Sequence, residues 1–353
     1  MNTVSTGAQF VRMQANNLAL QERLARLSDQ VATQKVSSDF AGLGSGARVS
    51  INLRGELKEL DTYSRNIAGA QLRLTTQVEA MERIGQLAKD LSVELIKLQS
   101  DPNAEVAVVN QIARQGYQEL TSLLNAKVDG RYVFAGGDGA NPPLPAARAD
   151  ALFAQTATDL TGPITNAATS LATTRATAAQ RGWFADTIDP DTGVPPVPVV
   201  PAVSARVDRD LDLEYGVPAT NGVYSDDVDL TQDLPYFREF LHAFAAAANV
   251  DKPTTPAELD ELRGYLQQVQ QGVDRATKRL DEEVGALGAL GSRMKTIDDR
   301  HKDLAVHLQR GVSDVEDVDM AAAITKLQLV QTQLQASYRV TSSLNQVNLN
   351  DFL

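Results

Sequence analysis

Apolar residues recur at intervals of three and four positions over about 50 residues in two separate parts of this chain, a period typical of long amphipathic helices. The first series includes Leu53, Leu57, Leu60, Ser64, Ile67, Gln71, Leu74, Val78, Met81, Gly85 and Ala88. The second includes Leu259, Leu262, Leu266, Val269, Val273, Ala276, Leu280, Glu283, Leu287, Leu290, Met294, Ile297, His301, Leu304 and Leu308. A helix of that length extends about 75 Å. It cannot bury its stripe against a compact globule, so each long helix needs a partner of matching length.

A shorter series of the same spacing flanks each long one. Near the N-terminus it includes Phe10, Met13, Asn17, Leu20, Leu24, Leu27 and Val31, and near the C-terminus Met320, Ala323, Leu327, Val330, Leu334, Ser337, Thr341 and Leu344. Gly42, Gly44 and Gly46 interrupt the N-terminal pattern and predict a loop. Since the order is short–long and then long–short, the chain is expected to fold back on itself as an antiparallel coiled-coil rod.

Two helix starts in the C-terminal part have clear sequence signals. Thr255-Pro256-Ala257-Glu258 combines a capping threonine, a proline at the first helical position and the glutamate of a capping box. Asp314, Glu316, Asp317 and Asp319 precede the last series, where the helix dipole favours negative charge. These signals predict a long helix that begins near residue 256 and a final helix that begins near residue 320.

The middle of the chain differs in composition from both flanks. Eleven of the 14 prolines fall between residues 142 and 235, and lysine is absent from 128 to 251. Pro195, Pro196, Pro198 and Pro201 favour an extended polyproline-like segment. The alternation of Val207, Arg209, Leu211, Leu213 and Tyr215 with Asp208, Asp210, Asp212 and Glu214 predicts a strand with one acidic, solvated face. The Ala/Thr-rich stretch 142–182 gives no periodic signal.

The predicted fold is therefore mainly α, a long antiparallel helical rod that carries an inserted middle domain rich in β-structure and loops. We expect terminal helices at 1–45 and 310–353, a rod domain at 46–134 and 251–309, and a variable outer domain at 135–250. A shorter helix is expected after Asp101-Pro102.

Composition excludes several classes of protein. The chain has no cysteine, which excludes disulfides, thiol nucleophiles and cysteine-ligated metal sites. The net charge of −12 disfavours nucleic-acid binding, which needs a clustered basic surface. The first residues lack the basic and apolar regions of a cleavable secretory signal, and no apolar run is long enough to span a membrane.

Motifs that carry chemistry are not found, and catalysis is not supported. The three histidines, His242, His301 and His307, form no H-E-x-x-H pattern, and His301 occupies a stripe position typical of a structural residue. The acidic residues at 208–214 lack the glycine and glutamate of an EF-hand loop, so a solvated strand face is favoured over a cation site. The segments 135–141 and 189–193 are interpreted as turns. No cofactor is expected.

The terminal helices are not expected to bury their apolar stripes by pairing with each other alone. Two short helices expose much of their apolar stripes, and exposed apolar surface of that size usually marks an interaction surface. We therefore expect the chain ends to pack against neighbouring copies. The predicted assembly residues are Phe10, Met13, Leu20, Leu24, Leu27, Leu327, Val330, Leu334, Leu344, Leu349, Phe352 and Leu353.

Local sequence adds a family resemblance to this interpretation. The segments Leu24–Ser28 (LARLS), SSDFAGLGSGARVSINLRGEL and Tyr63–Ile67 (YSRNI) resemble the N-terminal region of the bacterial flagellin family. The final ASYRVTSSLNQVNLNDFL resembles the closing helix of that family.

A second segment resembles one branch of this family. Residues 125–137, NAKVDGRYVFAGG, resemble the N-x-K-x-x-G-R-Y-x-F-x-G signature of the hook–filament junction branch, the hook-associated protein 3 family. The predicted motif residues are Lys127, Asp129, Gly130, Arg131, Tyr132, Phe134 and Gly136, of which Asp129 falls on an unspecified position of the signature. SDVEDVDMAAAITKLQ is also similar to the C-terminal region of that branch, whereas SSDFAGLGSGARVS departs from its usual K-P-S-D-D-P loop.

The resemblance implies a structural subunit of the bacterial flagellum that joins hook to filament, with no enzymatic activity. It implies packing against copies of itself in a ring or tube, contact with other axial proteins (hook-associated protein and flagellin), and an export chaperone on the C-terminal helix. It also implies an extracellular location after type III export without a cleaved signal peptide. Two alternatives stay open, a filament flagellin and a secreted coiled-coil binding protein whose middle domain engages a ligand.

Overall fold

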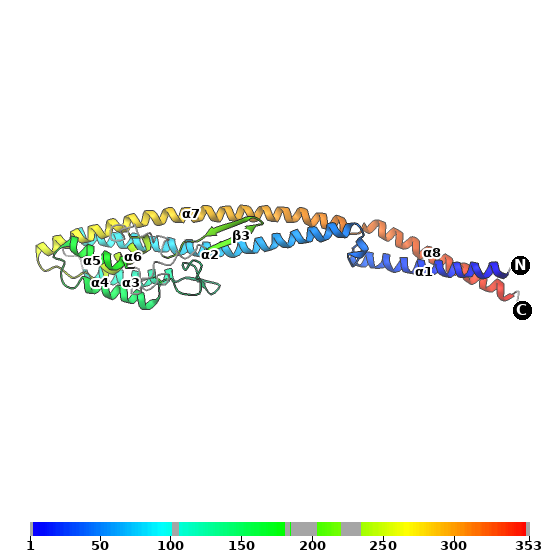
Figure 1. The fold of residues 1–353 in the computed structure, drawn as a ribbon, viewed down its shortest axis with the longest axis horizontal. Helices are drawn as coiled ribbons and strands as arrows, with labels where there is room; N and C mark the ends of the chain where they lie inside the picture. The colour runs from blue at the N-terminus through cyan, green and yellow to red at the C-terminus, as the bar shows by residue number, and fades with distance from the viewer. Residues whose placement is uncertain (1–2, 101–105, 181–183, 185–202, 220–233, 351–353) are drawn as a thin grey trace, which may run out of the picture. The chain divides into compact units, whose positions relative to one another are not determined.

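The fold is described from a computed structural model of the chain, which describes residues 3–100, 106–180, 184, 203–219 and 234–350 (Figure 1). Within helices, the side chains of residues 3–7, 9, 10 and 344–350 are not described. The chain divides into two compact units. Met1–Thr62 and Arg300–Leu353 form the first, and Tyr63–Asp299 form the second. The predicted proline-rich segment at 195–201 and the predicted turn at 189–193 lie outside the described residues.

In the first unit, the short helices α1 (Thr3–Thr33) and α8 (Met320–Asn350) lie side by side, with both chain ends at the same end of the pair (Figure 1). Ser337 Oγ donates a hydrogen bond to Asn17 Oδ1, and Gln21 Nε2 donates to Tyr338 Oη (2.7 Å). The residues of each helix that are shielded from solvent follow the predicted spacing of three and four. The predicted fold-back of the terminal helices is confirmed.

Both helical breaks of the first unit meet at one point. The segment after α1 contains the 3₁₀ turn η1 (Ala41–Leu43) before α2 (Gly46–Ser100) begins. The other break separates α7 (Pro256–Glu316) from α8. Val36 N donates to Glu316 O (2.7 Å), and Val318 N donates to Gln34 O (3.0 Å). The predicted glycine-rich break is therefore confirmed, and main-chain hydrogen bonds tie it to the other break.

The second unit is built on the long helices α2 and α7, which run side by side in opposite directions (Figure 1). Lys89 lies 3.7 Å from Asp281, while Gln99 O accepts a bond from Arg263 Nε (3.1 Å). Residues further along α2 thus meet residues earlier in α7, as antiparallel pairing requires. The long antiparallel helices predicted from the spacing are confirmed.

The start of α7 has the predicted capping box. Glu258 N donates to Thr255 Oγ1 (3.2 Å), and Thr255 N donates to Glu258 Oε2 (3.1 Å). Thr254 adds two further bonds to the same carboxylate, which hold the pKa of Glu258 below its ordinary value. The last helix is capped by Asp319, whose Oδ1 accepts from Ala322 N (3.0 Å).

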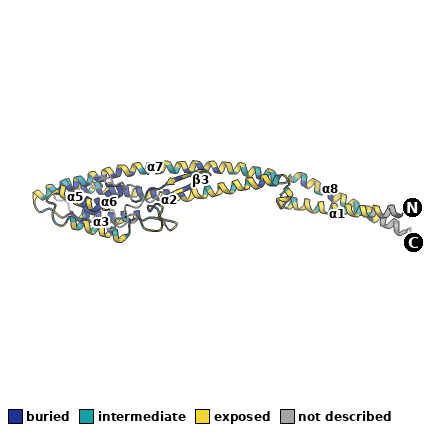
Figure 2. Ribbon diagram, in the orientation of Figure 1, coloured by how far each residue is buried: buried dark blue, intermediate teal, exposed yellow. Residues whose placement is uncertain are grey.

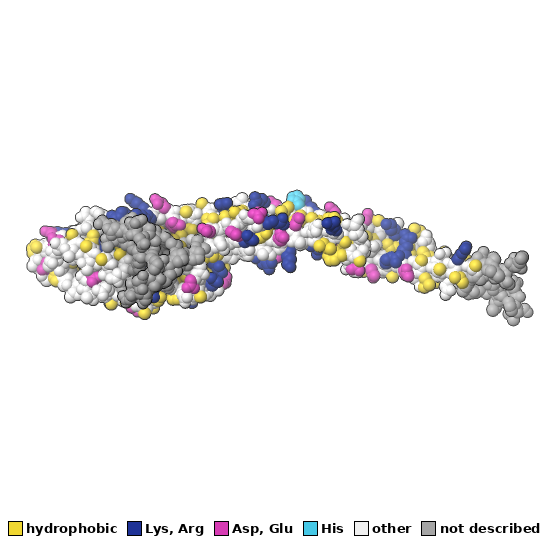
Figure 3. Space-filling view, viewed as in Figure 1, with side chains coloured by type: hydrophobic (Ala, Val, Ile, Leu, Met, Phe, Trp, Pro, Cys, Tyr) yellow, Lys and Arg dark blue, Asp and Glu magenta, His cyan; other side chains and the backbone are white. Residues whose placement is uncertain are grey.

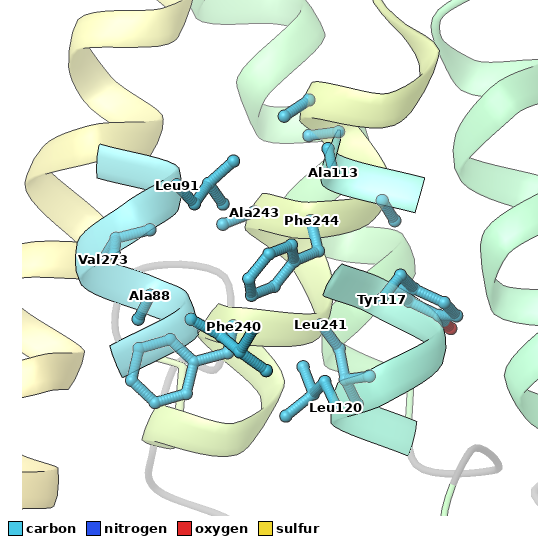
Figure 4. Close-up of a cluster of buried hydrophobic side chains, with 14 of the residues drawn as sticks. Ala88, Leu91, Ala113, Tyr117, Leu120, Phe240, Leu241, Ala243, Phe244 and Val273 are labelled. Carbon is cyan, nitrogen blue, oxygen red and sulfur yellow. The ribbon is translucent and has the colours of Figure 1, made fainter. Parts of the chain in front are cut away.

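The core of the second unit is centred on α6 (Tyr236–Asn249), whose residues 236–248 are all buried. A helix that is buried on every side must be enclosed by other elements. Figure 4 shows Phe240 on the side of Ala88 and Val273, and Leu241 on the side of Leu120. The enclosing helices include α3 (Val106–Leu124), α4 (Ala146–Asp159) and α5 (Ala167–Ala179).

Two antiparallel hairpins lie in the same unit. β1 (Lys127–Val128) pairs with β2 (Arg131–Tyr132), and β3 (Val203–Asp208) pairs with β4 (Leu211–Tyr215). The buried Val207, Leu213 and Tyr215 of the second hairpin form a small core with Ile67 and Met294 of the long helices.

The middle region is more helical than the sequence analysis predicted. Within its described residues, β-structure is confined to the β3–β4 hairpin, and α4, α5 and α6 form the rest of its regular structure. The predicted single strand at 207–215 is also corrected, because the chain turns at Arg209 and Asp210 and forms two strands. A two-residue connection alone would invert the alternation, but the register shift between Arg206 and Asp208 restores its phase, so one strand and this hairpin give the same pattern. Leu304, predicted to lie on the stripe of α7, is 46% exposed.

Candidate functional site

Those predicted assembly residues whose side chains the structure describes lie between α1 and α8 of one chain. Leu27 and Val330 are buried there. Other residues of the predicted set are partly shielded, namely Met13, Leu20, Leu24, Leu327 and Leu334. Phe10, Leu344 and Leu349 belong to the two helices, but their side chains are not described, and Phe352 and Leu353 lie outside the described residues. We refer to the shielded face between α1 and α8 as the seam.

A second set of large apolar residues on the same two helices is exposed. Val11 and Leu18 on α1 are 65% and 57% exposed, and they are seven residues apart, hence on one face. On α8, Leu329 and Val340 are 55% and 52% exposed. Figure 2 shows both helices mostly as exposed and intermediate residues, and Figure 3 shows apolar side chains among charged ones on their visible surface. We refer to Val11, Leu18, Leu329 and Val340 as the outward apolar residues.

The junction of the two helical breaks is held by a buried carboxylate. Glu316 accepts bonds from Arg54 Nε (2.7 Å) and Nη2 (2.6 Å) and from Ser50 Oγ (2.5 Å). Lys35 Nζ lies 3.5 Å from the same carboxylate and 2.5 Å from Asp317 Oδ1. Hydrogen bonds from Arg54 and Ser50 lower the pKa of Glu316 to about 2. Of the acidic residues predicted near this helix start, Glu316 and Asp317 form ion pairs, whereas Asp319 caps α8.

The segment that carries the junction-type signature folds as the β1–β2 hairpin and its continuation. Asp129 and Gly130 both have positive φ, +50° and +74°, which a two-residue hairpin turn of type I′ requires. Lys127 Nζ lies 4.2 Å from the centroid of the Tyr132 ring. Phe134 is fully buried and meets Phe237 of α6 edge to face, with 5.5 Å between ring centroids. The segment is thus anchored to the core of the second unit.

One buried side chain of α2 joins the two hairpin segments. Gln77 Nε2 donates to Val133 O (3.2 Å) and to Val217 O (2.5 Å), while Gln77 Oε1 accepts from Val217 N (3.0 Å). Gly216, at φ +81°, brings its backbone against this amide. Ala219 N donates to Phe134 O (2.8 Å), which adds a direct link between the segments. Gln77 therefore fixes the positions of both segments on α2.

The histidines are placed as structural residues. His242 is fully buried in a polar cluster, where Nε2 lies 2.9 Å from Thr174 Oγ1 and Nδ1 lies 3.8 Å from Glu239 Oε1. Burial alone would raise the pKa of Glu239, but His242 and Arg175 (2.9 Å) lower it below its ordinary value. His301 is buried on α7 and His307 is exposed. Thr174, Arg175, Glu239 and His242 are all buried, so this cluster belongs to the core of the second unit.

The acidic hairpin has the solvated face that the alternation predicted. Asp212 and Glu214 are exposed, and Asp212 pairs with Arg206 (3.0 Å). Among the described residues, no group of three acidic or histidine side chains is arranged to hold a metal ion. None of the helices in the described part of the chain combines the length and apolarity needed to cross a membrane.

Sequence reasoning missed Gln77 and the outward apolar residues. Gln77 lies on a helix face between apolar positions, and nothing in the local sequence distinguishes it from a solvated glutamine. Leu18 and Leu329 lie off the stripe of their helices, which is the signal that could have separated outward residues from seam residues. The Asp129-Gly130 dipeptide is a recognised hairpin signal and could have predicted the β1–β2 turn.

Comparison with known proteins supports a flagellar relationship. Residues 270–353 match the family model described as the bacterial flagellin C-terminal helical region. The fold is similar to a structure described as that of a flagellar hook-associated protein from Vibrio parahaemolyticus, with a TM-score of 0.51 and 12% identity over 79% of this chain and 99% of that chain. No curated protein matches the chain. The chain therefore resembles the bacterial flagellin family, as its sequence predicted, and the family match lies in its C-terminal helical region.

Proposed function

We propose that the chain is a non-enzymatic structural subunit of the flagellar axis and acts at the junction between hook and filament. The observation that carries this proposal is the exposed apolar surface of the α1–α8 pair. A helix pair that buries one seam and leaves Val11, Leu18, Leu329 and Val340 in water is incomplete as a monomer. The flagellin match over residues 270–353 covers α8 and supports the assignment to an axial protein.

Assembly supplies the missing burial. Covering one large aliphatic side chain stabilises a complex by about 1.5–3 kcal/mol, so a few such residues per chain suffice for a polymer in which each copy has several neighbours. In this proposal the seam residues, such as Leu24 and Leu334, hold α1 and α8 of one chain together. The outward apolar residues contact neighbouring copies or sister axial proteins. The predicted assembly residues thus contribute indirectly, by holding the two helices together.

The junction role is favoured over a filament flagellin by the signature at residues 125–137. Its hairpin, its buried Phe134 and its contact with α6 form a defined element of the second unit. Export through the flagellar type III route and a chaperone that covers residues 320–350 before assembly belong to the same proposal. An extracellular location on the flagellum follows from it.

Substitution of the outward residues tests the assembly proposal. Leu18→Asp combined with Leu329→Asp should leave the helical content unchanged and abolish incorporation into flagella, because charge cannot be buried between copies. Gln328→Asp, an adjacent exposed position on α8, is the matched control and should assemble normally. Normal motility of the double variant in the bacterium that encodes the chain would refute the assignment.

Copy number separates the junction role from the filament role. Immunogold electron microscopy with an antibody against the chain should label a single site where hook meets filament. Labelling along the whole filament would identify a flagellin instead. Label restricted to the medium, together with unchanged motility after gene deletion, would favour a secreted binding protein.

A further inference from the structure

A small cavity opens in the second unit between α2 and the two hairpin segments. Its lining includes backbone and side chains of Gln77, Val133 and Val217, which the Gln77 hydrogen bonds hold in place. The cavity volume is about 20 Å³, and its mouth is open to solvent. A space of that size accommodates little more than one water-sized group, so it suits the head of a ligand rather than a whole molecule.

Among the described residues that line the cavity, the charged side chains have one sign. Arg73 from α2 and Arg131 from β2 are the charged residues among those that line it. Two neutral polar groups, Tyr132 and Tyr215, lie beside them. Lys127 stacks on the Tyr132 ring and adds a third cation at the edge. Such a concentration of positive charge is unusual in a chain with a net charge of −12.

Arg73 has hydrogen-bonding capacity that the described residues do not use. Its Nη1 donates to Tyr215 Oη (3.2 Å), but its Nε is buried and has no hydrogen-bond partner in the described part of the chain. The positions three and four residues away on α2 are Gly69, Ala70, Thr76 and Gln77, so the helix offers no carboxylate to it. A buried, unpaired guanidinium N–H is costly, and a water or a ligand group that accepts from it removes this cost.

Arg131 is held in position and has guanidinium donors without a partner among the residues that the structure describes. Its Nη2 makes one long bond to Gly137 O (3.4 Å). Gly139 leaves the space that this side chain occupies, since a Cβ at that position would lie 2.7 Å from Arg131 Nε. The type I′ turn at Asp129-Gly130 fixes the strand that carries it. The local backbone thus sets where the second guanidinium lies.

We propose that this cavity is an oxyanion site whose ligand is a carboxylate. Guanidinium groups bind planar carboxylates through paired, charge-assisted hydrogen bonds, and tyrosine hydroxyls add neutral donors. The carboxylate comes either from a small organic acid or from an acidic side chain of a second copy of this chain. The second source rests on the proposed assembly function, whereas the site itself does not.

The Nε–Hε NMR signals of the arginines report on this site directly. In full-length protein, titration with sodium acetate against sodium chloride of equal ionic strength should shift the Arg73 and Arg131 signals saturably. Arg131→Gln should weaken acetate binding about tenfold or more, the loss expected for one charge-assisted interaction. Arg83→Gln is the control, because Arg83 lies on the same helix as Arg73, α2, but pairs with Glu119 outside the cavity.

The outcomes of this titration show whether the carboxylate site exists and, if it does, which molecule supplies the carboxylate. Equal shifts in acetate and chloride, or no saturable shift of either signal, would overturn the carboxylate site. If acetate binds and the same two signals also shift as protein concentration rises in chloride alone, a second copy supplies the carboxylate. If acetate binds without such concentration dependence, the ligand is a small organic acid, and the assembly function is unaffected.

Discussion

At the scale of single residues, the most consequential group is the Glu316 carboxylate. It joins Arg54, Ser50 and Lys35 where the two helical breaks meet, so one side chain connects segments distant in sequence. Such a role is not predictable from sequence, because the acidic residues near 316 satisfy the rule for helix starts equally well. The side chain that matters is distinguished only by its partners in space.

Glu316→Gln should lower the free energy of unfolding of the first unit by about 1–2 kcal/mol at pH 7, since charge-assisted bonds are lost while the Arg54 and Lys35 side chains stay partly solvated. Circular dichroism during urea unfolding measures this. Glu22→Gln, at an exposed pair 3.9 Å from Arg26, is the control and should change little. An equal effect of both substitutions would contradict the role of the cluster.

The same carboxylate predicts a pH dependence. Its pKa in the folded chain is about 2, below the ordinary value of 4.5. The unfolded chain therefore binds the proton more readily, and the stabilisation is present above pH 4.5 and disappears as the pH falls toward 2. Wild-type protein should lose stability across this window more steeply than Glu316→Gln. Parallel stability curves for the two proteins would rule this out.

Gln77 is the second residue whose importance is spatial. Gln77→Ala leaves Val133 O and both backbone groups of Val217 without their partner, so a loss of about 2–4 kcal/mol is expected for the second unit. Gln86→Ala on the exposed face of α2 is the control, with a single bond to Asp90 to lose. Thermal unfolding of both variants gives the comparison. Equal unfolding midpoints would show that the hydrogen bonds of Gln77 are dispensable for stability.

At the scale of elements, close helix packing depends on a glycine. A Cβ at Gly116 of α3 would overlap the Phe244 ring of α6, whereas a Cβ at Gly285 of α7 would meet open space. Gly116→Ala should therefore destabilise by about 1–3 kcal/mol through overpacking. Gly285→Ala should stabilise by about 0.5–1 kcal/mol through helix propensity. Urea unfolding distinguishes the two, and stabilisation by both would mean that α3 and α6 separate without cost.

Elements were predictable from sequence to different degrees. The long helices and the Thr255–Glu258 capping box follow from rules that act within a few turns of one helix. Helices α4 and α5 did not give a periodic signal, because alanine and threonine tolerate both faces of a helix. Helix α6 is enclosed on every side, and its polar residues Arg238, Glu239 and His242 are buried as well, so its pattern does not mark a solvent-exposed face.

At the scale of the whole molecule, the two units differ in how much they bury. The described part of α1 and α8 contains few buried apolar residues, such as Leu27, Ala323 and Val330, whereas the second unit has an extended core. Amide hydrogen exchange of the purified chain should show rapid exchange in α1 and α8 and strong protection in α3 and α6. Equal protection would mean that the terminal pair is complete by itself, which would weaken the assembly proposal.

The meeting of the two breaks has a consequence for tolerated changes in length. Main-chain bonds at Val36 and Val318 couple the segment after α1 to the segment before α8. A single inserted residue in one of them would put these main-chain bonds out of register with the other segment and displace the following helix. Length changes in the two segments are therefore expected to compensate each other. Natural variation in chain length should instead accumulate outside these two segments.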